Sequence, residues 1–175
     1  GAASTMPTEG TTFTYAAATD ISTSTYTIGT SINESKDSPT AADVSFASAV
    51  TEDDSTPAGE SVNSLFGTVF SDALDDQTAS GGSSPDTFTG ILITDDTSSS
   101  TQGTWEFSTD SGSNWAALST VTFDSSKPLY LDTAGMLRFV PATNYNGPVS
   151  DLAVYVADDG AVSTLPTTGT AFSSY

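Results

Sequence analysis

Residues 103–115 read GTWEFSTDSGSNW and contain the pattern of a complete β-hairpin. Trp105 and Phe107 alternate with Glu106. Successive side chains of a strand point to opposite faces, so the two rings share one face. The loop at residues 110–114, DSGSN, supplies the Asp and Gly that suit a tight turn. This stretch therefore predicts two antiparallel strands joined by a short polar loop.

The same kind of pattern continues on both sides of this hairpin. Short runs rich in Val, Ile, Thr, Phe and Tyr recur between turns rich in Gly, Pro, Asn, Asp and Ser, and helical periodicity is almost absent. Only the segment 62–74 also fits a short helical turn. We expect strands at residues 11–17, 24–32, 43–50, 65–71, 88–94, 103–108, 118–123, 128–132, 136–140 and 150–157. Short strands at this spacing predict an all-β fold, an Ig-like or cadherin-like antiparallel β-sandwich.

The composition excludes several classes of function. The chain of 175 residues has 22 acidic and 3 basic residues, a net charge of −19, and neither His nor Cys. Nucleic acid binding needs clustered Lys and Arg, and the familiar catalytic triads need His or Cys. No apolar run reaches the roughly 18 residues of a membrane-spanning helix. We therefore expect no enzyme, no nucleic acid partner and no membrane insertion.

The carboxylates are bunched at the ends of apolar runs. The bunches are Glu52-Asp53-Asp54, Asp72 with Asp75-Asp76, Asp95-Asp96 and Asp158-Asp159. Clustered Asp in Gly-, Ser- and Asn-rich turns, without His or Cys, is the ligand set of hard cations, above all Ca²⁺. Such ions would also relieve the self-repulsion of a compact polyanion.

The first candidate metal site combines the acidic residues after the strand expected at 65–71 with one residue from the end of the next loop. Its members are Asp72, Asp75, Asp76, Gln77 and Asp86. Carbonyl oxygens of the Gly/Ser-rich loop could complete the six to eight oxygens that Ca²⁺ takes. The alternative is an ordinary acidic loop that solvates one end of a sheet, because no EF-hand spacing is present.

Two further acidic groups are candidates. In one hypothesis, Glu52 and Asp53 share metal ions with Asp158 and Asp159. In the alternative, these residues cap turns through Asx-type hydrogen bonds. Asp110 with Asn114 and Glu106 is the other group, for which a plain hairpin tip is favoured. Among the aromatic residues, we expect Trp105 and Trp115 in the core, and leave Tyr130 and Tyr145 open between core and ligand surface.

Several fragments together resemble a known repeat. They are Val50-Thr51-Glu52-Asp53, Leu65-Phe66 with Phe70-Ser71-Asp72, residues 103–112, and Leu137-Arg138-Phe139-Val140-Pro141 with Asn144-Tyr145-Asn146-Gly147. Over roughly residues 40–160, the chain resembles the calcium-dependent β-sandwich domains of very large bacterial RTX-type adhesins. The loop at residues 80–86, followed by Phe88, is similar to the ligand-binding, peptide-binding subset of that family.

The resemblance implies a single β-sandwich domain over residues 1–175, with a core repeat at 40–160. In the family a Thr/Val-rich strand usually follows the repeat, whereas here a comparable stretch at residues 24–28 precedes it. Residues 1–35 are therefore expected to supply a strand to the sandwich or to belong to a preceding domain.

The function that the resemblance implies is calcium-dependent ligand binding at the bacterial cell surface. An extracellular module, monomeric within a longer chain, would bind a peptide or protein terminus on a target cell through loop-bound Ca²⁺, in cell adhesion and biofilm formation. Two alternatives stay open at this point. One is a structural extender repeat, whose ions only stiffen the adhesin, and the other is a Ca²⁺-dependent carbohydrate-binding module.

Overall fold

The computed structural model describes residues 24–160 and 165–172. The chain divides into two units, Gly1–Asn33 and Glu34–Tyr175. In the first unit, residues 25–33 belong to no helix or strand and have exposed side chains, and the strand expected at 11–17 lies outside the described residues. All strands and helices named below belong to the second unit.

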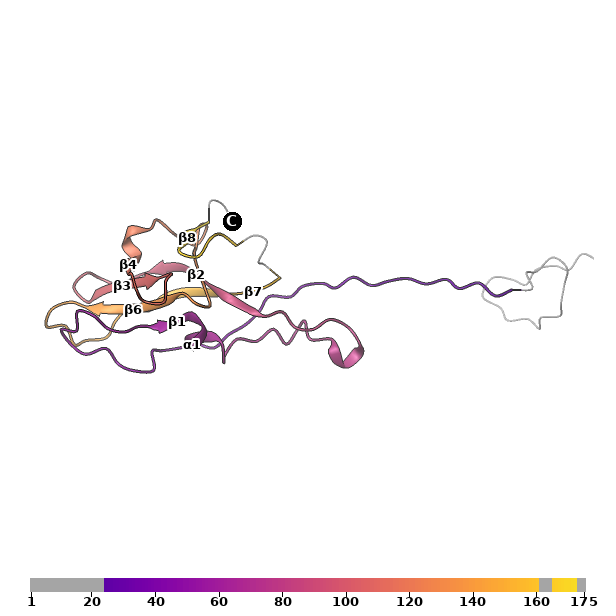
Figure 1. Cartoon of the computed structure of the whole chain (residues 1–175), viewed down its shortest axis with the longest axis horizontal. Helices are drawn as coiled ribbons and strands as arrows, with labels where there is room; N and C mark the ends of the chain where they lie inside the picture. Colours follow the sequence, from indigo (N-terminus) through magenta and orange to yellow (C-terminus); the bar gives the residue numbers. More distant parts are fainter. Residues whose placement is uncertain (1–23, 161–164, 173–175) are drawn as a thin grey trace, which may run out of the picture. The chain divides into compact units, whose positions relative to one another are not determined.

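The described part of the second unit is built from strands in two antiparallel sheets, with almost no helix (Figure 1). One sheet has the order β1-β6-β3-β4 and the other the order β7-β2-β5-β8. The strands of the first sheet are β1 (Glu60–Ser61), β6 (Met136–Pro141), β3 (Gly103–Ser108) and β4 (Ala116–Ala117). Those of the second sheet are β7 (Leu152–Asp158), β2 (Phe88–Asp96), β5 (Leu129–Asp132) and β8 (Thr170–Ala171). The all-β expectation is confirmed.

The hairpin expected at residues 103–115 is present as β3 and β4. Glu106 pairs with Ala117 across it, and Ser111 and Gly112 take the positive φ values that the tight turn needs. Asp110 holds the loop by accepting hydrogen bonds from the backbone and side-chain amides of Asn114. The turn chemistry in the sequence therefore produces the local structure directly.

Both sheets contribute to one hydrophobic core. Its centre is β2, which pairs with β5 on one side and β7 on the other and is buried from Gly90 to Ile93. Consecutive buried residues mean that both faces of this strand are covered, so it carries a continuous apolar run rather than an alternating one. Phe107 of β3 and Leu137 of β6 meet this cluster from the other sheet. The helix α1 (Val62–Phe66) adds its buried side chains, and Ser61 caps its N-terminus by accepting from the amide of Ser64.

Several expected strands differ from what forms. Residues 118–120 make a short 3-10 helix, η2 (Leu118–Thr120), and part of the run expected at 65–71 belongs to α1. Residues 43–50 make no strand, although Val44 and Phe46 pack against the core. The alternation of apolar and polar residues in this segment indicates correctly which side chains turn inward. No neighbouring strand among the described residues forms backbone hydrogen bonds with it. The strand expected at 24–32 likewise does not form among the described residues.

The aromatic residues divide between core and surface. Tyr130 is buried, and its hydroxyl donates to the carbonyl of Thr89. Trp105 packs half-buried against the core and stacks edge-on with Phe139. Trp115 lies outside the core cluster, under the guanidinium of Arg138 at 4.2 Å from the ring centroid, so its expected core position is corrected. None of the helices in the described residues is long and apolar enough to cross a membrane.

Candidate metal centre

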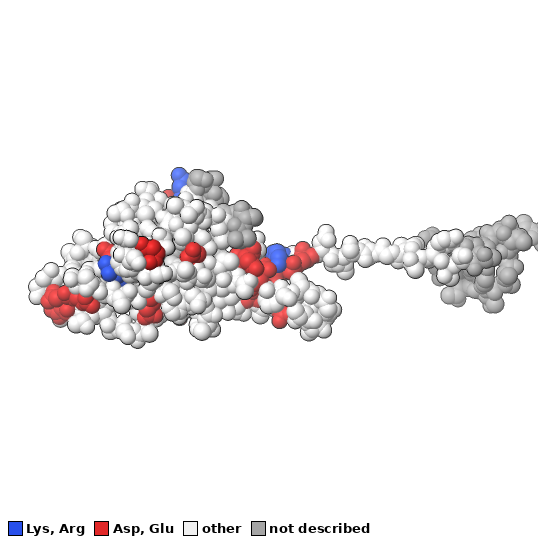
Figure 2. All heavy atoms as spheres, viewed as in Figure 1, with Lys and Arg blue, Asp and Glu red and all other residues white. Residues whose placement is uncertain are grey.

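The acidic residues of the second unit do not form one continuous surface. On the face drawn in Figure 2, the red side chains gather in several separate patches. Within the described residues, one group of three carboxylates lies close enough together to hold a metal ion, namely Asp72, Asp75 and Asp86. This group, which we call the carboxylate cluster, belongs to the loop that connects α1 to β2.

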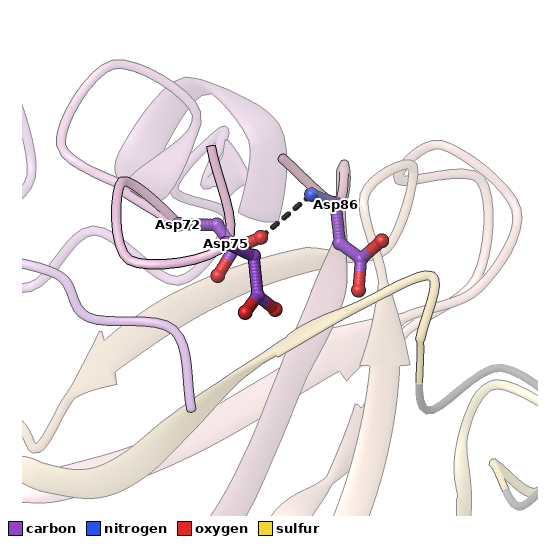
Figure 3. A group of neighbouring side chains, drawn as sticks. All are labelled: Asp72, Asp75 and Asp86. Atoms are coloured by element: carbon purple, nitrogen blue, oxygen red, sulfur yellow. Dashed lines mark hydrogen bonds between the residues drawn. The ribbon is translucent and has the colours of Figure 1, made fainter. Parts of the chain in front are cut away.

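The loop brings its two ends together through local hydrogen bonds. Its first part is fixed to the preceding segment where Thr40 and Ser71 exchange backbone hydrogen bonds, each at 2.8 Å. Its middle closes on itself where the amide of Gln77 donates to the carbonyl of Ser83 at 3.0 Å. At its end, the amide of Asp86 donates to Asp72 Oδ2 at 2.6 Å. These contacts place the three carboxylates at the start of β2 (Figure 3).

The geometry of the carboxylate cluster suits a single large cation. One oxygen from each side chain lies within 4.8 Å of the others. Two oxygens bound to the same Ca²⁺ at about 2.3–2.6 Å can be at most about 5 Å apart. The three side chains therefore need little rearrangement to share one ion.

The second observation is an unsatisfied buried atom. Asp72 is 5 % exposed and Asp75 3 % exposed. Asp72 Oδ1 is buried and has no hydrogen-bond partner among the described residues. An unpaired buried carboxylate oxygen is strongly unfavourable because desolvation is not compensated. A cation in the cluster would supply the missing partner.

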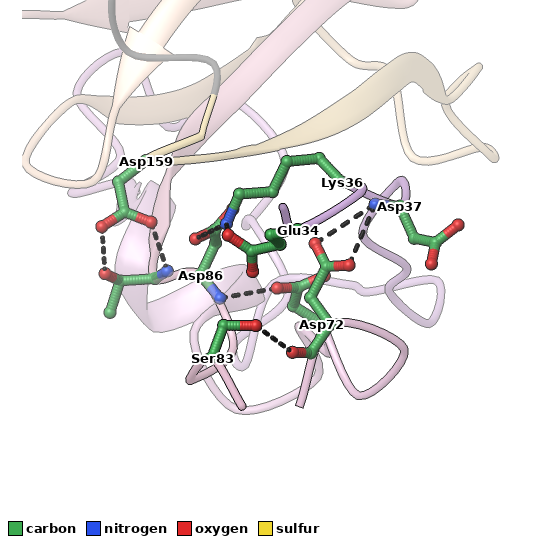
Figure 4. Close-up of polar contacts among 9 residues, drawn as sticks. Glu34, Lys36, Asp37, Asp72, Ser83, Asp86 and Asp159 are labelled. Atoms are coloured by element: carbon green, nitrogen blue, oxygen red, sulfur yellow. Dashed lines mark hydrogen bonds and ion pairs between the residues drawn. The ribbon is translucent and has the colours of Figure 1, made fainter. Parts of the chain in front are cut away.

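The segment just before residue 40 contributes donors to the same place (Figure 4). The amide of Asp37 donates to both oxygens of Asp75, at 3.0 and 3.2 Å. Lys36 Nζ lies 2.8 Å from Asp86 Oδ1 and 3.1 Å from Glu34 Oε2. The Asp86 and Glu34 contacts raise the pKa of Lys36 above its ordinary value, while hydrogen bonds from Ser83 and Lys36 lower the pKa of Glu34. The cluster therefore already attracts a positive charge.

The chain after β7 closes another side of the cluster. A Cβ atom on Gly160 would lie 2.6 Å from Asp86 Oδ2 and 3.0 Å from Asp158 Oδ1. Both carboxylates thus approach Gly160 closely, and Asp158 is itself buried. The absence of a side chain at residue 160 leaves these oxygens room beside the cluster.

Asp159 lies beside the cluster with its oxygens engaged elsewhere. Its Oδ1 accepts from the amide of Thr87 at 2.7 Å, and its Oδ2 accepts from the Thr87 hydroxyl at 2.8 Å. These two hydrogen bonds lower the pKa of Asp159. Asp159 therefore anchors the start of β2 to the end of β7.

Two residues expected in the first site lie in their own turn instead. Asp76 Oδ1 accepts from the amide and hydroxyl of Thr78, which lowers the Asp76 pKa. The side-chain amide of Gln77 donates to the carbonyl of Leu74. Both side chains are exposed. The described structure therefore joins Asp72, Asp75 and Asp86 and leaves Asp76 and Gln77 as turn-stabilising residues.

The other candidates are held apart from the cluster. Glu52 and Asp53 accept hydrogen bonds from Asn146 and Asn144 in the turn before β7, at 3.1 and 2.7 Å. Asp158 and Asp159 lie at the opposite end of β7, about 20 Å away for a strand of that length. The described structure does not bring these two pairs together. Asp110 closes the β3–β4 turn, as the hairpin interpretation expects, and its contacts with Asn114 and Ser108 lower its pKa to about 2.

Three functional neighbours were not singled out from the sequence. Lys36, Asp37 and Gly160 reach the carboxylate cluster from segments far away along the chain. Nothing in the spacing of these residues indicates the contact, because it depends on how the segment before residue 40 crosses the end of the second sheet. Comparison with known proteins adds no constraint, since no family model, curated protein or solved structure matches the chain.

Proposed function

We propose that this protein is a calcium-dependent ligand-binding module of a bacterial surface adhesin. In this proposal the second unit is an Ig-like β-sandwich, outside the cell, and the ion lies among Asp72, Asp75 and Asp86. The single observation that carries the proposal is the buried Asp72 Oδ1, which has no hydrogen-bond partner within a three-carboxylate cluster.

The donor chemistry favours Ca²⁺ over other cations. The cluster offers only carboxylate oxygens, and zinc sites in proteins are built mainly from Cys and His. Mg²⁺ demands a tighter octahedron at about 2.0–2.1 Å and keeps several waters, whereas Ca²⁺ accepts irregular loop geometry. A loop that is irregular between α1 and β2 therefore suits Ca²⁺ best.

The ion would have coordination positions left for a partner. Three side chains supply fewer than the six to eight oxygens that Ca²⁺ takes, unless some bind in a bidentate manner or carbonyls join them. Asp86 has a side-chain exposure of 15 % and is the most exposed of the three carboxylates. An oxygen of a ligand would complete the coordination shell from the side of Asp86.

Binding of a ligand carboxylate through the metal ion would overcome the electrostatic repulsion between this acidic protein and an anionic ligand. A chain with a net charge of −19 repels anions, and a bound dication reverses the local sign of the potential. We propose that the ligand is a peptide or protein terminus on a target cell, whose carboxylate binds the ion. The proposal of a peptide rests on the resemblance of the loop at residues 80–86, and the proposal of a metal-bound anion rests on charge.

The experiment that tests the function has two stages. Calorimetric titration of metal-stripped protein with Ca²⁺ should give a binding isotherm that D72N abolishes. An array of peptides with free C-termini, together with glycans, should then give peptide signals that vanish in chelator and when the termini are amidated. Calcium binding without any array signal would favour the extender, and glycan signals alone would favour the carbohydrate-binding module. Absence of calcium binding would contradict the whole proposal.

A further inference from the structure

An apolar groove of about 1500 Å³ runs along the open side of β7. One wall is formed by residues 41–50, with Val44 and Phe46 turned inward, and the other by Leu152, Val154 and Val156. These five side chains pack against the core but are only half-buried. Sites for small molecules usually measure about 300–1000 Å³. The volume of this groove exceeds that range, so it suits a peptide segment better than a small molecule.

The strand beside the groove has an unpaired edge. β7 pairs with β2 on one side, and in the described part of the chain no strand pairs with its other side. No backbone hydrogen bond joins described residues 41–50 to residues 152–157. The outer amides and carbonyls of this strand are therefore a template for one more strand. Neither Pro nor Lys interrupts this edge, and its outward-facing Tyr155 is 65 % exposed.

The first unit contains a segment with the complementary properties. Residues 25–32, TYTIGTSI, belong to no helix or strand, and in a strand conformation Tyr26, Ile28 and Ile32 would share one face at even positions. These three side chains are 83 %, 103 % and 94 % exposed. The segment carries no charge, in contrast to the acidic second unit. A strand with one uncovered apolar face is incomplete without a partner surface.

We propose that residues 25–32 of one copy of this chain add as an extra strand to β7 of a second copy. The unpaired edge of β7 would supply backbone hydrogen bonds, and the groove would receive Tyr26, Ile28 and Ile32. Eight residues span about 26 Å and the seven residues of β7 about 23 Å, so the two strands match in length. The lack of charge on the donor segment avoids repulsion by the acidic acceptor.

The contacts of residues 34–37 favour a second copy over the same copy. Lys36 and Asp37 are held against the loop by Asp86 and Asp75, which leaves only the short connection at residues 33–35 through which residues 25–32 could turn back onto β7 of the same copy. A strand donated by one copy leaves that copy's own groove open for another. When the exchange is not reciprocal, the contact is heterologous and produces head-to-tail assemblies, either closed rings or open chains.

Analytical ultracentrifugation of the full chain tests this inference. The average mass should rise with protein concentration between about 1 μM and about 1 mM, in Ca²⁺ and in chelator alike. I28K places a charge on the apolar face and should weaken association at least about tenfold. T27K places the same charge on the opposite face and should weaken it far less. A monomer at all concentrations, or equal effects of I28K and T27K, would overturn the proposal.

Hydrogen exchange locates the contact. In the associated state, residues 25–32 and residues 152–157 should gain protection together, and both gains should disappear in I28K. Protection that does not depend on concentration would mean that the segment folds back within one copy, and protection on another face would mean a different interface. Either outcome contradicts the proposal. D72N should leave the contact between residues 25–32 and β7 intact. Failure of the association can therefore be distinguished from failure of calcium binding.

Discussion

Lys36 Nζ lies 2.8 Å from Asp86 Oδ1, so the carboxylate cluster already interacts with a cation supplied by the chain itself. Lys36 is half-exposed, and Glu34 shares its charge at 3.1 Å. A Ca²⁺ ion that binds Asp86 has to displace this ammonium or work against its field. The ammonium and the proposed ion therefore compete for the same carboxylate.

Removal of the competing charge should strengthen calcium binding. Exposed ion pairs contribute about 0.2–1 kcal/mol, so K36M should lower the calcium dissociation constant by up to roughly fivefold. Isothermal titration calorimetry on metal-stripped protein measures this directly. K127M makes the same change in net charge in the Asp124–Lys127 turn, away from the cluster, and should have the smaller effect. Equal or weaker binding by K36M would contradict the competition.

The buried carboxylates should stabilise the protein only when calcium is bound. At about 100 times the dissociation constant, a bound ion adds about 2.7 kcal/mol, which corresponds to roughly 5–10 °C in melting temperature for a chain of this size. D72N and D75N should lose this gain and should differ little from the wild type in chelator, because Asn keeps an oxygen to accept the amide hydrogen bond. D76N is the control at an exposed turn. Equal losses in calcium and in chelator would show that these carboxylates are not ligands.

Substitution of Gly160 should reduce calcium affinity more than it reduces the stability of the fold. A Cβ at this position would lie 2.6 Å from Asp86 Oδ2, the end of a side chain that can rotate away. G160A should therefore weaken calcium binding several-fold by turning Asp86 out of the cluster, and the melting temperature in chelator should change little. G29A, where an added Cβ meets nothing, is the matched control. Unchanged calcium affinity in G160A would place Asp86 outside the coordination shell.

The β3–β4 turn should lose stability in acid. The contacts with Asn114 lower the pKa of Asp110 from 3.8 to about 2. A depressed pKa means that the carboxylate stabilises the fold above about pH 4, and that this contribution disappears as the pH falls through about 2. D110A should lower the melting temperature of metal-free protein at pH 6, and the difference from the wild type should close between those pH values. D95A provides an exposed control for the melting-temperature comparison. An NMR titration of Asp110 with a midpoint near 3.8 would contradict this contact.

The sequence predicts the long strands better than the short ones. β2, β3, β6 and β7 appear where apolar runs and turn residues indicate, and each of them pairs with a long neighbouring strand. Residues 118–123 have a similar composition but lack such neighbours, and a 3-10 helix forms at Leu118–Thr120. Asp95 and Asp96 look like an acidic turn, yet β2 continues through them because β7 pairs with both. Tertiary pairing thus decides what local composition leaves open.

The sequence predicts only part of the carboxylate cluster, because tertiary contacts decide the remainder. Asp72 and Asp75 are close together in sequence, and the loop returns Asp86 to them, so residue type and loop length are sufficient to propose the site. Lys36 and Gly160 reach it only through the crossing of distant segments. Asp76 has the same residue type as its neighbour Asp75 but points into its own turn at Thr78. Residue type therefore identifies candidate ligands, and backbone geometry selects among them.

The most direct test is a crystal structure of the full chain grown in millimolar calcium. We expect an ion with oxygens of Asp72, Asp75 and Asp86 at about 2.3–2.6 Å, with Lys36 displaced from Asp86. Asp72 Oδ1, which has no hydrogen-bond partner among the described residues, should be one of those ligands. A well-ordered cluster that holds only water, with Lys36 still bound to Asp86, would contradict the account.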